Sequence, residues 1–358
     1  MVTALRQGIL VPWQKQQAEM LKPAMDLFTA DQGGLVYQPR IGVHKKVAEI
    51  DFVSLYPAIM VHFNISPETI LPDPTADNLV PALGLAIDTS QEGLIPKALR
   101  PLLEKRIEMK KHLASTPTWD PYRKNFKRRA SALKWLLVTC FGYLGYKNAR
   151  FGRIEAHQAV TAYGREALLR AKEAAEDMGY RVIQLYVDGL WVQHPEKTQP
   201  EEIEPLLLEI QERTGLPISL DGIYRWVVFV GSRQNKKRPV ANRYFGVFQD
   251  GSIKVRGIDA RRRDSTPFVS DAQMHLLELL ASKPEPEDAL PEAIRFIRER
   301  LRTLRKGQVE LSDLLVRQRL GRKLEAYRTL SPAARAVLQL QAAGKEMRPG
   351  PVSYTHLT

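Results

Sequence analysis

Two basic stretches with helical periodicity constrain the fold of this chain more than any other feature. Residues 97–114 and 121–141 each repeat apolar positions at helical spacing, and the loop-forming stretch STPTWD separates them. They predict an antiparallel helical hairpin that projects from the body of the protein. Residues 97–150 hold 14 Lys or Arg against three acids, Glu104, Glu108 and Asp120, so this hairpin carries most of the surplus positive charge.

The segments around the hairpin show strand and helix patterns. Residues 34–51 alternate apolar and polar positions around Pro39 and Gly42, which predicts a β-hairpin whose second strand ends at Asp51. In RVIQLYVDGLWVQ, two strand-like runs flank Asp-Gly and predict a strand, a tight turn at DG and a strand. Other strands are expected at 225–231 and 243–257, and helices at 57–63, 155–178, 201–214 and almost continuously from 268. The pattern predicts an α+β catalytic core with two appended helical parts.

Charge and cysteine content narrow the class of protein. The 358 residues include 53 Lys or Arg and 40 Asp or Glu, and the net charge of +13 favours a polyanionic partner over a merely soluble basic surface. Cys140 is the single cysteine, and no charged leader with an apolar core opens the chain, so we expect a cytoplasmic protein. The longest nearly apolar run, WLLVTCFGYLGY, is shorter than the roughly 20 residues of a membrane-spanning helix, so no membrane association is expected.

Two aspartates at predicted strand ends are the candidate catalytic residues. Asp51 lies between the strand KVAEI and the segment FVSLYPAIM, and a helix N-cap is its alternative interpretation. Asp188 lies at the tip of the second hairpin, where a simple Asp-Gly turn is the alternative. Two carboxylates on neighbouring strand ends, facing a cationic helical hairpin, are what a magnesium-dependent phosphoryl-transfer site requires. The pair therefore predicts a metal site.

The helical hairpin supplies candidate ligands for a triphosphate. Arg106 and Lys110 are four residues apart and share one face of the first helix, while Lys134 lies on the second helix with Val138 and Phe141. Together they could grip a triphosphate. The alternative is a solvated basic face, since Lys and Arg are ordinary residues on the surface of helices.

Five ordered motifs resemble those of the family B DNA polymerases. EIDFVSLYPAIM is similar to motif A, ALKWLLVTCFGYLGY to a divergent motif B, and GYRVIQLYVDGLWV occupies the place of motif C. NRYFGVFQDGSIKVRGIDARRRD resembles the later palm motif that contacts the primer-template, and DLLVRQRLGRKLEAYRTLSPAARAVLQLQAAGKEMRPG resembles the thumb. The resemblance covers almost the whole chain. It implies a right-hand polymerase with an antiparallel-sheet palm, helical-hairpin fingers and a mainly helical thumb.

The resemblance also implies roles for individual residues. Asp51 and Asp188 would bind two Mg²⁺ ions, and Tyr56, framed by Leu55, would be the steric gate that collides with a ribose 2′-hydroxyl. Arg106, Lys110, Lys134 and the divergent Val138 would surround the incoming nucleotide, and the primer-template motif contributes Arg243, Tyr244, Lys254 and Arg256. Lys254 and Arg256 are two apart on a predicted strand and so share one face, for which an exposed strand face is the alternative. For Tyr56 the alternative is a core tyrosine.

Two motifs depart from the family pattern. Motif C usually carries two aspartates, whereas this chain has one, and two alignments are open; without a gap, Tyr186 replaces the first aspartate and Asp188 is the second. We prefer this alignment because no deletion is needed, and it retains the shared metal ligand. In motif B the usual asparagine is Val138 and the usual tyrosine is Phe141. Losing a hydrogen bond to a charged group costs about 1.5–3 kcal/mol, or roughly ten- to a hundredfold in rate or nucleotide affinity.

The expected domains are a palm in two parts, residues 1–95 and 154–266, fingers at 96–153 and a truncated thumb at 267–358. The region before Asp51 is too short for the family's N-terminal and exonuclease domains, so no proofreading is expected within this polypeptide. The final VSYTHLT is unlike the expected continuation of a thumb, and we interpret it as a truncated or artificially joined end.

The expected function is template-directed DNA synthesis from dNTPs on a primer-template, with Mg²⁺ as cofactor and a location at the nucleoid. The first alternative is a polymerase-derived DNA-binding accessory protein that has lost catalysis, which the altered motifs B and C motivate. A primase or RNA polymerase is a weaker alternative, because Tyr56 should exclude the 2′-hydroxyl. A clamp or exonuclease partner is left open.

Overall fold

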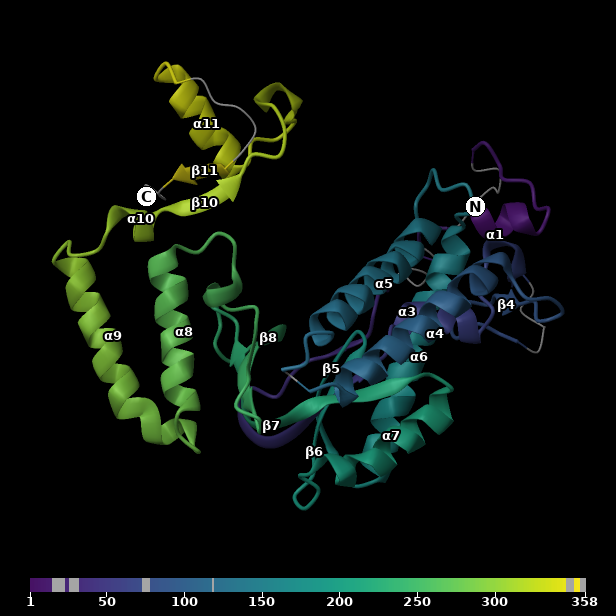
Figure 1. The fold of residues 1–358 in the computed structure, drawn as a ribbon, viewed down its shortest axis with the longest axis horizontal. Coiled ribbons are helices and arrows are strands. Elements are labelled where there is room, and N and C mark those ends of the chain that lie inside the picture. Colours follow the sequence, from purple (N-terminus) through teal and green to yellow (C-terminus); the bar gives the residue numbers. More distant parts are fainter. Residues whose placement is uncertain (15–22, 26–31, 73–77, 118, 346–350, 355–358) are drawn as a thin grey trace. The chain divides into compact units, whose positions relative to one another are not determined.

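The computed structural model describes residues 1–14, 23–25, 32–72, 78–117, 119–345 and 351–354 (Figure 1). The chain divides into two compact units. Unit 1 comprises Met1–Arg40 and Lys46–Ile223, and unit 2 comprises Ile41–Lys45 and Tyr224–Thr358. Strands β2 (Gly42–Phe52) and β7 (Ile218–Gly231) have residues in both units.

The sheet of unit 1 carries the two candidate aspartates. Its strand order is β1 (Val36–Tyr37), β5 (Arg181–Tyr186), β6 (Gly189–Gln193), β2 and the start of β7. The pairs β1–β5, β5–β6 and β6–β2 are antiparallel, and Asp51 of β2 lies opposite Gly189 of β6. Residues 182–185 of β5 and 189–192 of β6 are buried, so these two strands lie in the core of the unit.

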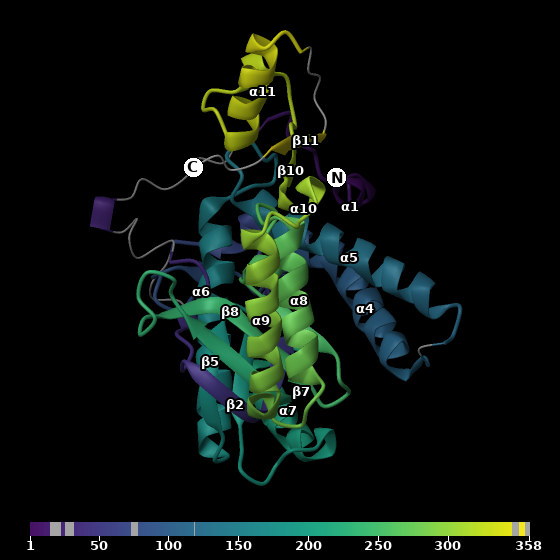
Figure 2. The same cartoon turned by 90° about the vertical axis from the view of Figure 1, so that its left-hand side faces the viewer.

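Helices of unit 1 cover this sheet and form the basic hairpin. Helix α3 (Leu55–His62) follows β2 directly, and α6 (Ile154–Asp177) and α7 (Pro200–Thr214) complete the core with it. The long helices α4 (Leu94–Ser115) and α5 (Arg123–Leu144) lie side by side, and Figure 2 shows them extending outward from the sheet of their unit. The short elements are α1 (Val2–Arg6), a 3-10 turn at Pro67–Thr69, β3 (Ile70–Leu71) and β4 (Ala86–Ile87).

Helix α6 lies close to its neighbours because its buried face is built from small residues. Buried alanines recur at helical spacing along the whole length of α6, and Val160 and Leu168 are larger residues on the same buried face. The alanines are Ala156, Ala159, Ala167, Ala171, Ala174 and Ala175. This close approach brings the backbone at Gly164 against the ring of Tyr56 on α3, as a Cβ at Gly164 would lie 3.1 Å from Tyr56 Cε1. The helix thus forms one wall of the region around Tyr56.

Unit 2 contains three antiparallel strands, a pair of helices and a small C-terminal subdomain. Strand β7 pairs with β8 (Pro239–Phe248), and β8 with β9 (Ile253–Arg256). Helices α8 (Pro267–Ala281) and α9 (Leu290–Arg305) lie side by side in Figures 1 and 2. The C-terminal subdomain holds α10 (Leu311–Leu314), α11 (Pro332–Ala342) and the two-stranded sheet of β10 (Val316–Arg319) and β11 (Pro351–Tyr354). Short 3-10 turns lie at Asp259–Arg261, Pro286–Ala289 and Leu324–Ala326.

The α+β fold class and the helical hairpin are confirmed, whereas four local predictions are wrong in detail. The first predicted hairpin does not form, because β1 pairs with β5 and β2 with β6. The predicted strand at 243–257 is a hairpin, β8–β9, and the predicted helical segment after 268 includes the β10–β11 sheet. The tight turn after β5 consists of Val187 and Asp188, since Gly189 already belongs to β6 and pairs with Tyr186.

Three further predictions concern membrane spans, the C-terminal segment and the domain boundaries. In the described part of the chain, no helix is both long and apolar enough to cross a membrane. Of the VSYTHLT segment, Val352–Tyr354 lie in β11 and residues 355–358 are outside the described residues. The boundaries of palm, fingers and thumb stay predictions.

Candidate active site

Asp51 lies near the end of β2, at the point where the chain leaves the sheet. The amide of Val53 donates to the carbonyl of Pro217 (2.8 Å), and Ser54, with φ of 57°, turns the chain into α3. Ser54, and not Asp51, occupies the N-cap position of that helix. The alternative interpretation of Asp51 as a helix cap is therefore wrong, and its carboxylate is available for another role.

Backbone hydrogen bonds hold the turn that carries Asp188 beside β2. The amide of Phe52 donates to the carbonyl of Asp188 (2.8 Å), and the amide of Val187 donates to the carbonyl of Leu35 (2.9 Å). Val187 adopts a left-handed conformation with φ of 58°, which costs a β-branched residue about 1–3 kcal/mol. The carboxylate of Asp51 lies next to this turn, since a Cβ at Gly189 would be 3.4 Å from Asp51 Oδ1, an ordinary contact distance.

The surroundings of Asp51, which lines one pocket with Asp188, strongly favour the protonated form of its carboxyl. Burial, followed by the charges of Asp188 and Asp221, raises the pKa of Asp51 from 3.8 to about 8, and the charge of Lys110 opposes this shift. A desolvated carboxyl beside other carboxylates retains its proton unless a cation replaces it. The site is therefore electrostatically suited to a divalent cation.

A cavity of about 100 Å³ opens at these carboxylates and collects most of the predicted nucleotide-binding residues. Its lining contains the predicted residues Asp51, Asp188, Leu55, Tyr56, Arg106, Lys134 and Val138, together with Phe52, Ser54, Pro57, Phe141 and Val187. Lys110 is not part of the lining, but its charge acts on Asp51. The structure thus brings two helices of the basic hairpin, the start of α3 and two strand ends to one pocket.

Arg106 is the best-placed cation for an anionic ligand. Its side chain is only 9% exposed, and Nε and Nη1 donate no hydrogen bond to another described residue. Burial lowers the pKa of the guanidinium, and the charge of Asp51 opposes this effect. Unsatisfied buried donors on a cation are costly, and a bound phosphate would satisfy them.

Tyr56 lies in a tightly bounded position beside the pocket. Burial and then the charge of Asp188 raise the pKa of its hydroxyl, so Tyr56 stays neutral at physiological pH. A Cβ at Gly34 would lie 3.2 Å from the hydroxyl, and one at Gly164 would lie 3.1 Å from Cε1. Tyr56 is half-buried: it packs against the hydrophobic core and also lines the pocket, and its role as a gate stays a prediction.

Val138 offers a direct test of the departure in motif B. The side chain is 47% exposed and lines the pocket, so a polar residue can replace it without burying an unsatisfied group. We expect Val138→Asn to raise kcat/KM for the incoming nucleotide roughly tenfold, because an amide can hydrogen-bond to the triphosphate. Single-nucleotide incorporation kinetics measure this effect. The control is Leu136→Asn, at an exposed position outside the pocket lining. An unchanged kcat/KM in Val138→Asn would contradict the prediction that Val138 lies at the nucleotide.

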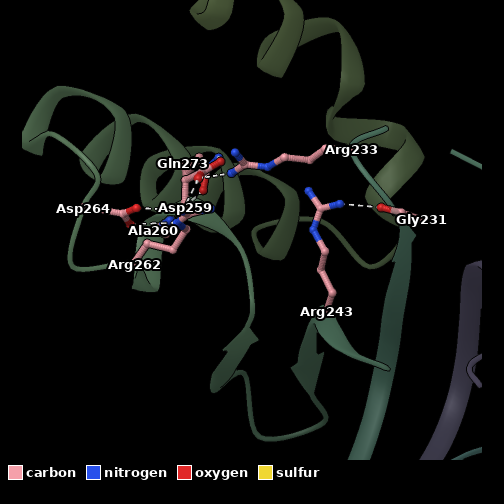
Figure 3. A network of polar contacts seen from close by, with 8 residues as sticks. All are labelled: Gly231, Arg233, Arg243, Asp259, Ala260, Arg262, Asp264 and Gln273. Atoms are coloured by element: carbon pink, nitrogen blue, oxygen red, sulfur yellow. Dashed lines mark hydrogen bonds and ion pairs between the residues drawn. The ribbon is translucent and has the colours of Figure 1, made fainter. Parts of the chain in front are cut away.

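The four predicted DNA-contact residues lie in unit 2 and differ in their surroundings. Lys254 and Arg256 are half-buried on β9 and flank the buried Val255, so they share one strand face as expected. Arg243 donates to the carbonyl of Gly231 (Figure 3). Tyr244 is 2% exposed, with its ring 5.4 Å from that of Phe229. Because Tyr244 faces the core side of β8, we do not retain it as a side-chain contact to DNA.

A polar network fixes the segment that follows β9. Arg233 pairs with Asp259, and Gln273 donates from Nε2 to Asp259 (3.2 Å) while accepting from the amide of Ala260 (2.7 Å) (Figure 3). Arg262 pairs with Asp264, which lowers the pKa of Asp264 to about 2. Two arginines of the predicted primer-template motif, Arg243 and Arg262, therefore have internal partners, and so does Arg233, which precedes the motif.

Sequence reasoning did not identify Asp221, Glu49 or His157. Asp221 is an exposed residue of β7 and Glu49 a buried residue of β2, and both charges raise the pKa of Asp51. His157 of α6 stacks on Phe141 (4.2 Å between ring centroids). The local sequence Ser-Leu-Asp-Gly around Asp221 does not indicate a role at the site, because Asp221 acts on Asp51 only through the order of the strands in the sheet.

The carboxylates fit magnesium better than a metal that needs a full set of protein ligands. Within the described ranges, no group of three or more His, Cys, Asp or Glu side chains is placed to hold a metal ion. Mg²⁺ is commonly held by one or two carboxylates, with phosphates and water as further ligands. Asp51 and Asp188 match this pattern, and the adjacent cations match the phosphates.

The pocket brings two carboxylates together with Arg106 and Lys134, and comparison with known proteins identifies the family. The sequence model of DNA polymerase family B matches residues 1–204 and 211–350. DNA polymerase 2 of Aeropyrum pernix is 31% identical over 323 residues, which are 89% of this chain and 38% of that protein. The DNA polymerase of Archaeoglobus fulgidus is 28% identical over 349 residues, which are 96% of this chain and 43% of that protein.

A solved structure gives the same result. The family B DNA polymerase from the hyperthermophilic archaeon Pyrobaculum calidifontis has a TM-score of 0.66 and 27% identity, over 98% of this chain and 44% of that chain. The chain therefore belongs to DNA polymerase family B, and the predicted resemblance and the right-hand polymerase fold class are confirmed. It spans less than half the length of these relatives, 38% and 43% for the two curated proteins.

Proposed function

We propose that this chain is the polymerase core of a DNA-directed DNA polymerase, which adds dNTPs to the 3′ end of a primer annealed to a DNA template. The observation that carries the proposal is the single pocket in which Asp51 and Asp188 meet Arg106 and Lys134, in a chain of DNA polymerase family B. Its partners are then primer-template DNA and dNTPs, its cofactor is Mg²⁺, and it acts at the nucleoid.

Each pocket residue has a distinct part in this reaction. Asp51 and Asp188 would hold the metal, with the charges of Asp221 and Glu49 adding to the negative potential at Asp51. Two Mg²⁺ ions, when bound, would activate the primer 3′-hydroxyl and stabilise the leaving pyrophosphate. Arg106 and Lys134 would neutralise the triphosphate and orient it toward the primer, and Lys110 would add to the positive potential.

The experiment that tests this proposal is template-directed incorporation by the wild-type chain. A labelled primer on each of four templates, differing in the first unpaired base, is incubated with Mg²⁺ and one dNTP at a time. We expect only the complementary dNTP to be added in each case, and no addition in the presence of EDTA. Intact duplex binding without any addition would favour the non-catalytic DNA-binding protein.

Tyr56 provides a prediction about the sugar of the substrate. Tyr56→Ala removes the ring that we expect to collide with a 2′-hydroxyl, so the preference for dNTPs over rNTPs should fall by about 10–200-fold, the range for one small group in a shaped pocket. The ratio of kcat/KM for dCTP and CTP measures this. The control is Tyr163→Ala, because Tyr163 is a partly buried tyrosine outside the pocket lining. An unchanged ratio in Tyr56→Ala would contradict the steric-gate assignment.

Lys254 and Arg256 provide a prediction about duplex binding. If each neutralises one phosphate, Lys254→Ala and Arg256→Ala should each weaken primer-template binding at every sequence and lower the salt slope by about one. Fluorescence anisotropy of a labelled duplex across a range of salt concentrations measures the slope. The exposed Lys283, which follows α8, supplies the control variant Lys283→Ala. An unchanged slope in both test variants would assign Lys254 and Arg256 to an ordinary exposed strand face.

A further inference from the structure

Three rings from three helices stack in series beside the pocket. Tyr56 on α3 and Phe141 on α5 have ring centroids 4.3 Å apart at an interplanar angle of 36°. Phe141 and His157 on α6 have centroids 4.2 Å apart at 17°, close to parallel. Tyr56 and Phe141 line the pocket, whereas His157 is behind Phe141 and is not part of the lining.

The imidazole of His157 is held from two sides. Its Nδ1 lies 3.2 Å from the carbonyl oxygen of Phe141, and because a carbonyl only accepts, Nδ1 carries the hydrogen. A Cβ at Gly145 would lie 2.9 Å from the same Nδ1, so the ring lies directly against the backbone that ends α5. The imidazole of His157, whose Cα belongs to α6, therefore lies directly against the end of α5 and is joined to it by one hydrogen bond.

The stack and the hydrophobic core together hold Phe141 and Tyr56 at the pocket. Phe141 has no hydroxyl through which a hydrogen bond could hold its ring, so packing alone holds it. Tyr56 meets backbone at Gly34 and Gly164, where no side chain can yield, and meets the ring of Phe141 at 4.3 Å. Any displacement of Tyr56 toward Phe141 therefore requires Phe141 to move toward His157.

We propose that His157 is a positioning residue for sugar selection: through Phe141, it sets how far the ring of Tyr56 reaches into the nucleotide pocket. This inference rests on the proposed function, in which Tyr56 is the steric gate. Removing the imidazole leaves a space behind Phe141, and both rings relax toward it because side chains move to fill a void more easily than backbone does. The gate then stands further from the sugar, and a 2′-hydroxyl is tolerated.

The test measures the ratio of kcat/KM for dNTP and rNTP in His157→Ala, His157→Phe and the control His194→Ala. His194 is also a half-buried histidine that packs on an aromatic ring, that of Tyr180 at 5.0 Å, but it lies outside the pocket lining. We expect the ratio to fall roughly 2–10-fold in His157→Ala, the value of one aromatic pair. It should stay near the wild-type value in His157→Phe, which keeps a flat ring, and in His194→Ala.

A double-variant comparison separates a positioning role from a general structural one. If His157 acts through Tyr56, His157→Ala should lower the ratio in the wild-type background and have no further effect in Tyr56→Ala. Gly145→Ala, whose Cβ would lie 2.9 Å from Nδ1 and so displace the imidazole, should change the ratio in the wild-type background and leave it unchanged in Tyr56→Ala; it serves where His157→Ala does not fold. A drop of equal size in both backgrounds would overturn the proposal.

Two measurements separate the role of His157 from the polymerase activity of the chain. Normal dNTP incorporation by His157→Ala with an unchanged dNTP-to-rNTP ratio would overturn the role of His157 alone. Absence of both incorporation and dNTP binding in the wild-type chain would overturn the proposed function, and the role of His157 with it.

Discussion

Asp51→Asn and Asp188→Asn should each reduce single-nucleotide incorporation at least about a thousandfold. An amide keeps the size of the side chain but removes the charge that holds a divalent cation, and metal stabilisation of a phosphoryl-transfer transition state is worth several kcal/mol. The two losses should not add, because either substitution dismantles the same site. Rapid-quench measurements on a primer-template saturated with protein isolate the chemical step from DNA binding.

The control for this prediction is Glu173→Gln, which removes an exposed carboxylate of α6. It should incorporate nucleotides at the wild-type rate, and all variants should bind the duplex with wild-type affinity. Asp221→Asn is expected to reduce incorporation less than Asp51→Asn or Asp188→Asn. Asp221 is exposed, and its charge raises the pKa of Asp51 less than the charge of Asp188 does. Full activity of Asp188→Asn would show that the hairpin carboxylate is only a turn residue.

Without metal, the stability of the protein should fall as the pH rises from about 4 to about 8, and Asp51→Asn should remove much of this fall. Burial and the charge of Asp188 raise the pKa of Asp51 from 3.8 to about 8 in the folded chain. Between these values the folded state holds a proton that the unfolded chain has lost, so a rise in pH favours unfolding. Above about pH 8 both states are deprotonated, and this contribution becomes constant.

Thermal denaturation at several pH values in EDTA measures this effect. At pH 8, Asp51→Asn should melt roughly 5 °C or more above the wild type, because the amide has no charge to desolvate. Added Mg²⁺ should raise Tm in the wild type at pH 8 more than at pH 6, where protons compete for Asp51, and should have little effect on the variant. Identical pH profiles for wild type and Asp51→Asn would contradict the assignment of a buried carboxylate pair.

The sequence predicted the long-range pairing of Asp51 with Asp188 through motif resemblance, but it misplaced the local turn. Asp-Gly is a strong hairpin signal, which placed the turn one residue too late. The register is set instead by partners far away in the chain: Gly189 lies opposite Asp51, and the amide of Val187 bonds to Leu35. The resulting left-handed Val187 has no sequence signature, because a β-branched residue is disfavoured in that conformation.

Which face of an element a residue occupies was predictable only where the local pattern was regular. Lys254 and Arg256 alternate with the buried Val255, so their shared face follows from strand periodicity. In β8, Tyr244 follows Arg243 in a run of mixed polarity that does not indicate which face is buried. The structure shows that the ring of Tyr244 is buried against Phe229. The stack of Tyr56, Phe141 and His157 has no sequence signal at all, because each ring comes from a different helix.

We propose that Asp51 and Asp188 act as one metal-holding pair although motif C retains a single aspartate. Binding of Mn²⁺, a substitute for Mg²⁺ that electron spin resonance detects, to the chain with primer-template and dNTP bound tests this pairing. We predict that Asp51→Asn and Asp188→Asn each weaken Mn²⁺ binding at least about tenfold, whereas Glu173→Gln leaves it unchanged. Equal Mn²⁺ affinity in the wild type and both aspartate variants would contradict the account.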